Sequence, residues 1–353
     1  MAAAIAAARE GFNVTVVDRA LPPIDKPCGE GIMPDGLSAL HEMGIHLEST
    51  SAVPFEGIRF VGDGKRIEAQ FEAANGLGIR RTTLHRALLE RAAKEGVSME
   101  WGISVDEITV QTARVGSQQV RYRWLVCADG QNSRLRQMAG LDSVRVLGRR
   151  YGFRQHFRIA PWSRSVEVHW SDCGQLYITP TASDEICMAF VTSNPKMRLR
   201  QALQEFTEVG ERLRDCATVT REQGAITSTS SLRSVHRGRI ALLGEASGSV
   251  DAITGEGLST AFRQANAFVS AIKNDDLRLY ESAHRKIMRR PRAMSRMLLL
   301  MDRNPSIRHR VLHALSSEPS VFSRLLAIHT GMLSPVQFGL HGVLSFGWGF
   351  VSA

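Results

Sequence analysis

The stretch Gly238–Asn266, GRIALLGEASGSVDAITGEGLSTAFRQAN, decides the fold of this chain. Its apolar run from Ile240 to Leu243 lies between two glycines, which is the pattern of a buried strand in a parallel sheet. After Gly257 the apolar residues recur at helical spacing, at Leu258, Ala261, Phe262, Ala265 and Phe268. The segment is therefore predicted to run as strand, tight loop and helix. The N-terminus of such a helix presents free backbone N–H groups and the positive end of its dipole, which suits an anionic ligand.

This stretch resembles the second FAD-binding motif of the flavoprotein family that holds the para-hydroxybenzoate hydroxylases and the geranylgeranyl reductases. Gly244-Glu245 stands where that family usually has Gly-Asp, and the resemblance places both residues beside the ribitol and phosphate region of FAD. It also places the helix start, Gly255-Glu256-Gly257, against the pyrimidine side of the flavin. The alternative interpretation is an ordinary strand–loop–helix unit of an α/β protein.

The composition is that of a large soluble globular protein. With 353 residues the chain is long enough for two domains, and 43% hydrophobic and 22% charged residues are ordinary values. The formal charge of +9 favours dinucleotides, acidic carrier proteins or membrane surfaces as partners. No nucleic-acid-binding module is recognisable, so no nucleic-acid partner is expected. No apolar run reaches the length of a membrane span.

The cysteines indicate a reducing compartment. They are odd in number and widely spaced, at Cys28, Cys127, Cys173, Cys187 and Cys216. We therefore expect reduced thiols, a cytoplasmic location and no metal site. The N-terminus also lacks the charged start and cleavage pattern of a signal peptide.

The first elements predict part of a dinucleotide-binding unit. Residues 1–11 favour a helix that ends at Gly11, and the run from Phe12 to Val17 follows as a strand closed by Asp18. In a βαβ unit such an acidic residue binds the ribose hydroxyls, so Asp18 and its neighbour Arg19 are candidates for the adenosine end of FAD. No Gly-x-Gly-x-x-Gly occurs in the chain. We expect a late start, after the first strand and its phosphate loop, with a natural truncation as the alternative.

The loop over residues 25–36, DKPCGEGIMPDG, is rich in turn-forming residues. It resembles the Cys-Gly loop that passes beside the flavin in the geranylgeranyl-reductase branch. Gly29 and Gly31 are expected to let the backbone approach the cofactor. Cys28 is the candidate catalytic residue, since a thiol beside a flavin or a helix end can be acidified and reactive. A small cysteine packed in a turn is the alternative.

Two more segments resemble FAD contacts of the family. Arg81 opens a predicted helix over residues 80–96, and the resemblance implies that it contacts FAD, whereas a solvated arginine is the alternative. Asp129-Gly130 resembles the Asp-Gly motif between the FAD pyrophosphate and the nicotinamide route. Asp129 is expected to fix its turn by accepting backbone N–H bonds.

The predicted fold class is α/β. We expect a Rossmann-like FAD-binding domain of the glutathione-reductase type, with an inserted antiparallel-sheet substrate domain and a helical C-terminus. The FAD-binding domain is assigned to residues 1–54, 76–146 and 225–275, the substrate domain to 55–75 and 147–224, and the helical region to 276–353. The substrate domain is predicted to hold a hairpin that turns at Gly62-Asp63-Gly64. Its other elements are strands over 151–159, 165–170, 175–179 and 186–192, and a helix over 196–216.

The antiparallel sheet is expected to cover the flavin and to carry the substrate pocket. The candidates are Phe153, His156, His169, Trp170, Tyr177 and Pro180. Core or sheet surface is the alternative for each of them. His156 shares a strand face with Arg154 and Arg158, which suits either an anionic substrate or a solvated surface.

The sequence of the C-terminal region indicates helices. Residues 278–303 form an arginine-rich amphipathic helix with Met294, Met297, Leu298 and Met301 on its apolar side, and residues 336–353 are apolar. Packing against the cofactor domain is one interpretation. A peripheral membrane contact is the other.

The resemblance implies an FAD-dependent oxidoreductase that uses NAD(P)H or another reductant. An apolar, lipid-like or carrier-bound substrate would suit the basic surface and the apolar C-terminal segment. The run from Cys28 to Gly31 favours reduction of an isoprenoid or other activated double bond over hydroxylation. Halogenation is a lesser alternative, because the Trp-x-Trp-x-Ile-Pro run of tryptophan-type halogenases is absent. The competing class is a non-catalytic protein of the same fold with impaired FAD binding.

Overall fold

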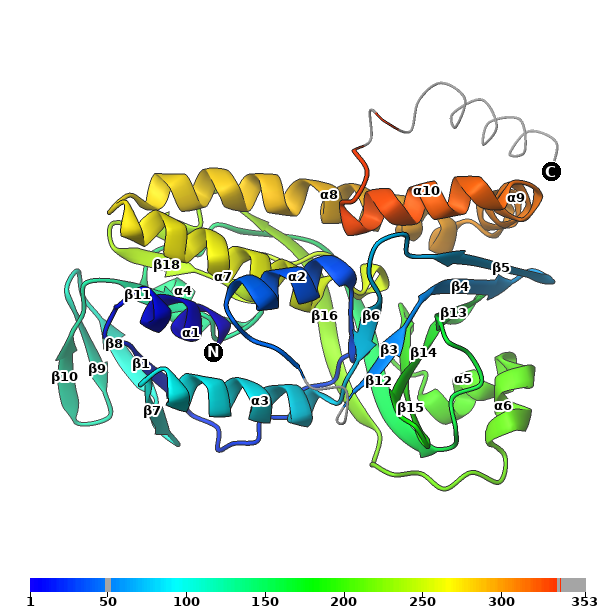
Figure 1. Ribbon diagram of the computed structural model, residues 1–353, viewed down its shortest axis with the longest axis horizontal. Coiled ribbons are helices and arrows are strands. Elements are labelled where there is room, and N and C mark those ends of the chain that lie inside the picture. Colours follow the sequence, from blue (N-terminus) through cyan, green and yellow to red (C-terminus); the bar gives the residue numbers. More distant parts are fainter. Residues whose placement is uncertain (48–51, 335–336, 338–353) are drawn as a thin grey trace.

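The computed structural model describes residues 1–47, 52–334 and 337 (Figure 1). Helix α1 (Ala2–Arg9) ends before Gly11, whose φ of 82° is the left-handed conformation in which helices stop. The chain then enters β1 (Thr15–Asp18), which pairs in parallel with β7 (Ser98–Trp101). The predicted helix and the strand closed by Asp18 are both confirmed.

A second parallel pair carries the stretch that decides the fold. β11 (Leu125–Cys127) pairs in parallel with β18 (Ile240–Leu242), and β17 (His236–Arg237) pairs antiparallel with β18. β18 leads through two 3₁₀ turns, η2 (Gly244–Ser247) and η3 (Ala252–Thr254), into helix α7 (Gly257–Lys273). The predicted order of strand, loop and helix is confirmed.

Helices α1, α2 (Pro34–Glu42), α3 (Arg81–Lys94) and α7 pack around one apolar core with these strands. Ile5, Leu84 and Tyr280 are fully buried there, and Phe268 is nearly so. This half also contains a three-stranded meander of β8 (Val105–Ile108), β9 (Thr112–Val115) and β10 (Gln118–Arg121), and the short helix α4 (Arg134–Met138).

A seven-stranded sheet forms the other half, in the order β16-β12-β15-β14-β13-β4-β5. Its neighbours are antiparallel, except that β13 pairs in parallel with β4. The hairpin of β4 and β5 turns at Asp63 and Gly64, both at positive φ, as predicted. The strands are β4 (Gly57–Gly62), β5 (Lys65–Gln70), β12 (Val144–Arg158), β13 (Val166–Ser171), β14 (Gly174–Ala182), β15 (Glu185–Thr192) and β16 (Gln223–Leu232).

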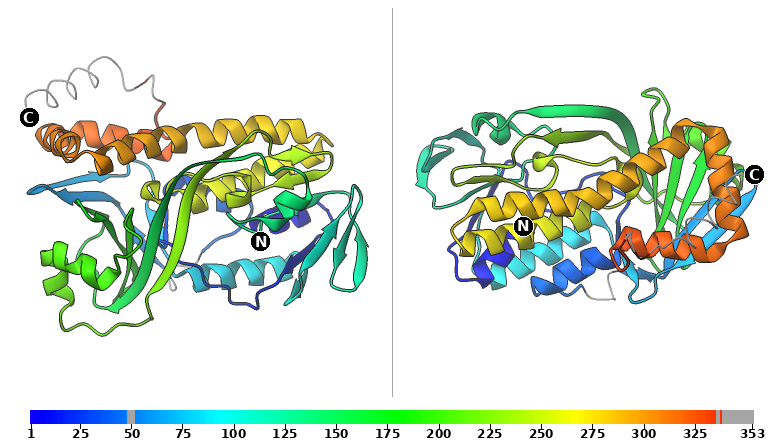
Figure 2. Two further views of the ribbon diagram at one scale, coloured as in Figure 1. Left: turned by 180° about the vertical axis from the view of Figure 1, so that it is seen from behind. Right: turned by 90° about the horizontal axis from the view of Figure 1, so that it is seen from above.

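Helices cover both faces of this sheet (Figures 1 and 2). One face packs on α5 (Leu199–Glu205) and α6 (Thr207–Leu213), in a core that includes Ile178 and Met188. The other face meets α8 (Leu277–Arg303), α9 (Pro305–Ser317) and α10 (Pro319–Thr330), in a core that includes Val168 and Leu312. A small sheet of β2 (Gly31–Ile32), β6 (Gly76–Gly78) and β3 (Val53–Phe55) joins the two halves.

The structure differs from the prediction at two places. The helix predicted over 196–216 is two helices, because Phe206 leaves helical geometry and buries its ring in the core under the sheet. The sheet continues through β16 to Leu232, past residue 224, because the long strand β12 pairs with both β15 and β16. The C-terminal region is helical through Thr330, and the predicted apolar segment 336–353 lies, except for Gln337, outside the described residues.

Within the described ranges, no helix is both long and apolar enough to cross a membrane. All five cysteines are free thiols.

Candidate functional site

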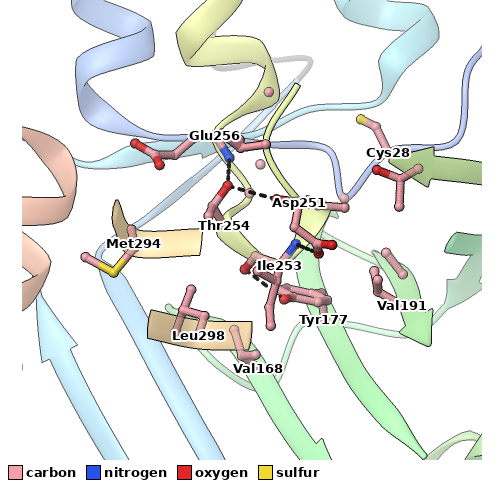
Figure 3. A pocket seen from close by; sticks show the side chains of 18 of the residues that line it. Cys28, Val168, Tyr177, Val191, Asp251, Ile253, Thr254, Glu256, Met294 and Leu298 are labelled. Carbon is pink, nitrogen blue, oxygen red and sulfur yellow. Dashed lines mark hydrogen bonds between the residues drawn. The ribbon is translucent and has the colours of Figure 1, made fainter. Parts of the chain in front are cut away.

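A cavity of about 680 Å³ lies where α7, the seven-stranded sheet and the C-terminal helices meet. One end, here called the loop end, is lined by Cys28–Gly31, Gly244-Glu245 and Gly255–Gly257. The other end, the apolar chamber, is lined by side chains of the sheet and of α8, α9 and α10. Figure 3 shows Cys28 and Glu256 at the loop end and Val168 and Leu298 in the chamber.

The loop end is a backbone cradle. An added Cβ at Gly29, Gly244, Gly255 or Gly257 would meet no atom within 4 Å, so open space lies beside all four glycines. Gly244 and Gly255 have φ values of 60° and 67°, which side chains disfavour. Helix α7 begins at Gly257 without a side-chain cap, so the positive end of its dipole is available to a ligand.

Asp129 holds the neighbouring turn as predicted. Its carboxylate accepts hydrogen bonds from the Ser133 hydroxyl and from the Leu135 N–H, the latter at 3.1 Å. Gly130 has a φ of 85°, and a Cβ placed on it would lie 4.0 Å from Lys26 Nζ. The Asp129-Gly130 turn therefore lies against the loop that carries Cys28.

Asp18 and Arg81 lie together at the N-terminal end of α1. Burial and then Arg81 lower the pKa of the Met1 amino group, while Asp18 opposes the shift. Burial and Arg81 likewise lower the pKa of His85, with a smaller contribution from Lys26. Asp18 Oδ1 accepts the Ala20 N–H at 2.9 Å, which fixes its turn after β1.

These residues fit FAD. Asp18 offers a carboxylate for the ribose, Arg81 and Lys26 offer positive charge for the pyrophosphate, and the glycine cradle accepts a flat ring. Glu245 is exposed and lines the cavity, and its contact with the ribitol remains a prediction. Arg19 is exposed, and its contact with the cofactor remains a prediction. Gly31 also lines the cavity but packs against the sheet, since an added Cβ would lie 3.7 Å from Phe55 and Thr179.

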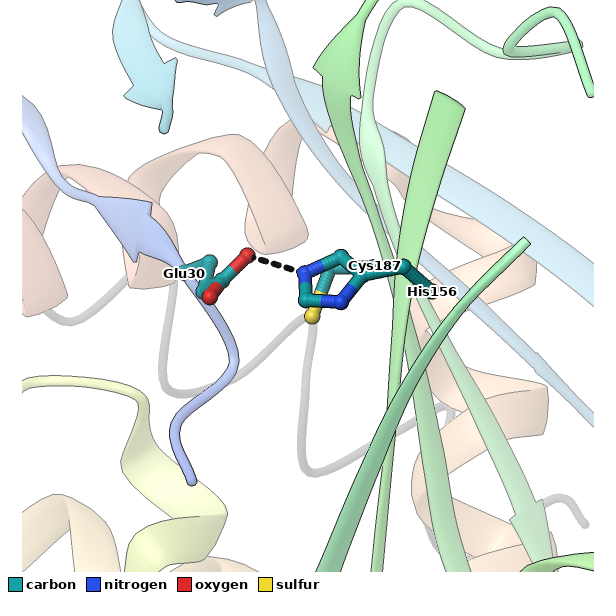
Figure 4. A group of neighbouring side chains, drawn as sticks. All are labelled: Glu30, His156 and Cys187. Carbon is teal, nitrogen blue, oxygen red and sulfur yellow. Dashed lines mark hydrogen bonds and ion pairs between the residues drawn. The ribbon is translucent and has the colours of Figure 1, made fainter. Parts of the chain in front are cut away.

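Glu30 is the centre of a buried ion network that the sequence analysis did not single out (Figure 4). Its Oε2 lies 2.6 Å from His156 Nε2, and its Oε1 accepts from the Arg154 guanidinium at 3.0 Å and from the Arg81 N–H at 2.9 Å. Arg154 also donates to Asp25 at 2.7 Å. These bonds tie the Cys28 loop to β12, so Arg154 is neither solvated nor free to bind a substrate.

Glu30, His156 and Cys187 also form a trio whose ligand atoms lie within 4.8 Å of one another, a grouping that can hold a metal ion. Glu30 and His156 are 126 residues apart in the chain, so no spacing in the sequence predicted the trio. Both carboxylate oxygens of Glu30 are already engaged, and Arg154 brings a positive charge to the same group. Burial and Glu30 keep the pKa of the Cys187 thiol well above its usual value. We therefore interpret the trio as a hydrogen-bonded brace.

Cys28 lines the cavity, but its thiol is not acidified. Burial, and then the Glu30 carboxylate, raise the pKa of Cys28 to about 11. The Glu30 N–H points at Cys28 Sγ at 3.2 Å. The thiol is neutral at physiological pH, contrary to the expectation of an acidified group. A catalytic role for Cys28 stays a prediction.

A second buried network holds the turn before Gly255. Arg150 and Asp251 are 4% and 2% exposed, and Arg150 Nη1 lies 3.1 Å from Asp251 Oδ1. Asp302 of α8 is the other counter-charge, with its Oδ2 3.4 Å from Arg150 Nη2. Asp251 Oδ1 also accepts the Ile253 N–H at 3.0 Å, and the Tyr177 hydroxyl donates to the Ile253 carbonyl at 2.9 Å. Residues of β12, β14 and α8 thus hold in place the turn that leads into the loop end.

The apolar chamber lies between the sheet and the C-terminal helices, which the sequence analysis did not assign to the pocket. Its helix side includes Met294, Leu298, Met301, Val311, Phe322 and Leu326. The signal in the sequence was the apolar face of the arginine-rich helix, which indicated packing but not its partner. Of the predicted pocket residues, Phe153, Trp170 and Tyr177 line the cavity.

The other predicted pocket residues do not line it. Val168 and Trp170 point into the chamber, so the intervening His169 faces the opposite side, where it bonds to Glu167 at 2.9 Å. His156 is fully buried against Glu30. Thr179 lines the cavity, whereas its neighbour Pro180 packs with its carbonyl against Gly78 of β6. The alternation along each strand was predictable, but not which face met the cavity.

The cavity wall has a buried polar spot where Glu256, at the loop end, meets His329 of α10. Glu256 is 2% exposed, and its Oε2 lies 3.7 Å from His329 Nδ1. Neither atom has a hydrogen-bond partner among the described residues. Arg290 lies 3.5 Å from Glu256 Oε1 but pairs more closely with Asp35, at 2.5 Å. Burial raises the pKa of Glu256, and His329 and Arg290 oppose the shift without cancelling it.

Comparison with known proteins assigns the family. The FAD binding domain family matches residues 1–274. The menaquinone reductase of Mycobacterium tuberculosis is 26% identical over 318 residues, which cover 80% of this chain and 76% of that protein. Digeranylgeranylglycerophospholipid reductase 1 of Methanopyrus kandleri is 26% identical over 309 residues, 78% of each chain.

A solved structure shows the same fold. The flavoprotein/dehydrogenase from Cytophaga hutchinsonii superposes with a TM-score of 0.84 at 15% identity, covering 100% of this chain and 97% of that one. The chain therefore belongs to the FAD binding domain family of flavoprotein oxidoreductases.

Proposed function

We propose that this FAD-dependent oxidoreductase reduces a double bond in an apolar, lipid-like or carrier-bound substrate. The observation that carries the proposal is the apolar chamber, which opens directly onto the glycine cradle. A long hydrocarbon substrate would fill this chamber and place one bond at the loop end. Two of the relatives are named as reductases, one of menaquinone and one of a digeranylgeranyl lipid, which supports the same class.

The chain's own residues support such chemistry by excluding water and holding a proton. Once reduced by NAD(P)H or another donor, bound FAD would supply a hydride to the double bond, and saturation of that bond would also need one proton. We assign that proton to the Glu256 carboxyl, because burial raises its pKa and its Oε2 has no hydrogen-bond partner within the described ranges. His329 Nδ1, 3.7 Å away, can return a proton to it after each turnover. Tyr177 is less suited, since its hydroxyl already donates to Ile253.

The test is an anaerobic re-oxidation experiment. The purified chain is loaded with FAD, reduced with NADPH or with dithionite, and mixed with an isoprenoid quinone or a geranylgeranyl lipid without oxygen. A reductase regains the visible band of oxidised flavin and yields a saturated product. Recovery that needs O₂, with an oxygen atom in the product, would assign monooxygenation instead. Failure to retain FAD through gel filtration would favour the non-catalytic alternative. Reduction by NADPH as well as by dithionite tests our proposal that NAD(P)H is the donor.

The chamber offers a matched pair of variants for this assay. Leu298 lines the chamber and is 7% exposed, whereas Leu279 is on the same helix and 49% exposed. Leu298→Trp should slow re-oxidation by a long substrate, because the larger side chain fills part of the chamber. Leu279→Trp should leave the rate unchanged. Equal rates for the two variants would contradict the proposal that the substrate binds in the chamber.

A further inference from the structure

Helix α8 carries a row of cations on its outer surface. Arg285, Arg289, Arg292, Arg296 and Arg303 recur at helical spacing and form one face, here called the arginine stripe. All are exposed except the half-buried Arg292. Among the described residues, the stripe has one ion pair, from Arg285 to Glu281 at 3.3 Å.

The stripe is electrostatically unbalanced. Burial lowers the pKa of Arg292, and the charge of Arg296 lowers it further, so neighbouring cations repel one another. In a chain of formal charge +9, such a concentration on one helix indicates an anionic partner outside the molecule.

The cavity opens beside this stripe. Met297 and Leu300 of α8 and Ile226 of β16 line the cavity, yet they are 37%, 49% and 58% exposed. We call these three residues the apolar mouth. Leu147 of β12, 51% exposed, extends the apolar surface on the neighbouring strand. The end of the stripe reaches the same strand, because Arg303 Nη2 lies 3.9 Å from where a Cβ on Gly148 would stand.

We propose that the arginine stripe and the apolar mouth dock together on an anionic lipid surface, so that an apolar substrate enters the chamber directly from the lipid. Cations beside exposed apolar side chains are the pattern of a surface-bound amphipathic helix, with the arginines at the headgroups and the apolar residues below them. An acidic protein would satisfy the arginines but not an open apolar mouth. Of the predicted apolar side of the helix, Met294, Leu298 and Met301 line the chamber, whereas Met297 belongs to the exposed mouth.

The test measures vesicle binding by the full chain loaded with FAD, and it uses no substrate, so it stands apart from the proposed reaction. Vesicles of phosphatidylcholine alone are compared with vesicles of equal parts phosphatidylcholine and phosphatidylglycerol. We expect binding to the anionic vesicles only, weakened by salt. The variant Arg289→Gln/Arg296→Gln/Arg303→Gln should bind about a hundredfold more weakly.

The matched control, Arg121→Gln/Arg200→Gln/Arg221→Gln, changes the net charge equally at exposed sites outside α8 and should bind like the parent chain. Met297→Gln/Leu300→Gln should bind about tenfold more weakly without any change in charge. Retained FAD and an unchanged circular dichroism spectrum show that each variant folds. If the stripe variant and the control lose the same affinity for anionic vesicles, the proposal is overturned, because net charge alone would then explain binding. Binding to polyglutamate but not to anionic vesicles would overturn it in favour of an acidic protein.

Discussion

Replacing Asp251 with asparagine tests how the loop end is held. The change removes the charge that pairs with Arg150 but keeps an oxygen that can accept the Ile253 N–H. Removing one partner of a buried ion pair costs about 3–5 kcal/mol. Asp302 stays 3.4 Å from Arg150 as a second counter-charge. We therefore expect a cost at the lower end of this range, a loss of about 3 kcal/mol in the free energy of unfolding.

The same substitution should also weaken FAD binding. The turn that Asp251 fixes leads directly into Gly255–Gly257, which line the loop end. A loosened turn must be ordered when FAD binds, and this ordering opposes association. We expect the Kd for FAD to rise about tenfold, which corresponds to about 1.4 kcal/mol.

Urea unfolding of the FAD-free chain and titration of FAD by fluorescence quenching measure the two effects. Glu208→Gln is the control, because Glu208 pairs with Arg66 at the surface, where both side chains are about half exposed. That pair should contribute less than about 1 kcal/mol and leave FAD binding unchanged. The reasoning is refuted if Asp251→Asn behaves like the control in both assays.

Three further predictions concern titratable groups. Glu256→Gln should retain FAD but lower turnover about a hundredfold, because the proton donor is lost. The variant should also unfold at a higher urea concentration near neutral pH. The raised pKa of the Glu256 carboxyl means that its charged form destabilises the fold, and glutamine carries no charge. Unchanged turnover would contradict the assignment. Cys28→Ser should leave the pH dependence of turnover near neutrality unchanged, because a thiol with a pKa of about 11 does not titrate there; a shifted profile would restore Cys28 as a catalytic residue. Burial by itself would raise the pKa of Glu167, but hydrogen bonds with His169 and Trp162 outweigh it and lower this pKa to about 2. Glu167→Gln should therefore lower the free energy of unfolding by about 3 kcal/mol at neutral pH. That difference should shrink as the pH falls from 4.5 toward 2, and a difference that persists in acid would argue against the pairing of the Glu167 carboxylate with His169.

The elements that form the loop end were predictable because their signals are local. The strand from Ile240, the glycine-rich turns and the helix after Gly257 follow from apolar spacing and turn chemistry within a few residues. Asp129 was likewise expected to bond its own turn, and it does so. Such interactions join residues close in sequence, so the chain records them directly.

The sequence by itself determined the fold class, the order of the motifs and the cofactor family, whereas the tertiary structure alone decided the lining of the cavity. The alternation along β13 showed two faces, but only packing against α8 turned Val168 inward and His169 outward. The partnership of Glu30 with His156 joins segments 126 residues apart. The physical reason is that burial and charge pairing depend on which surfaces meet in space, and local patterns do not carry that information.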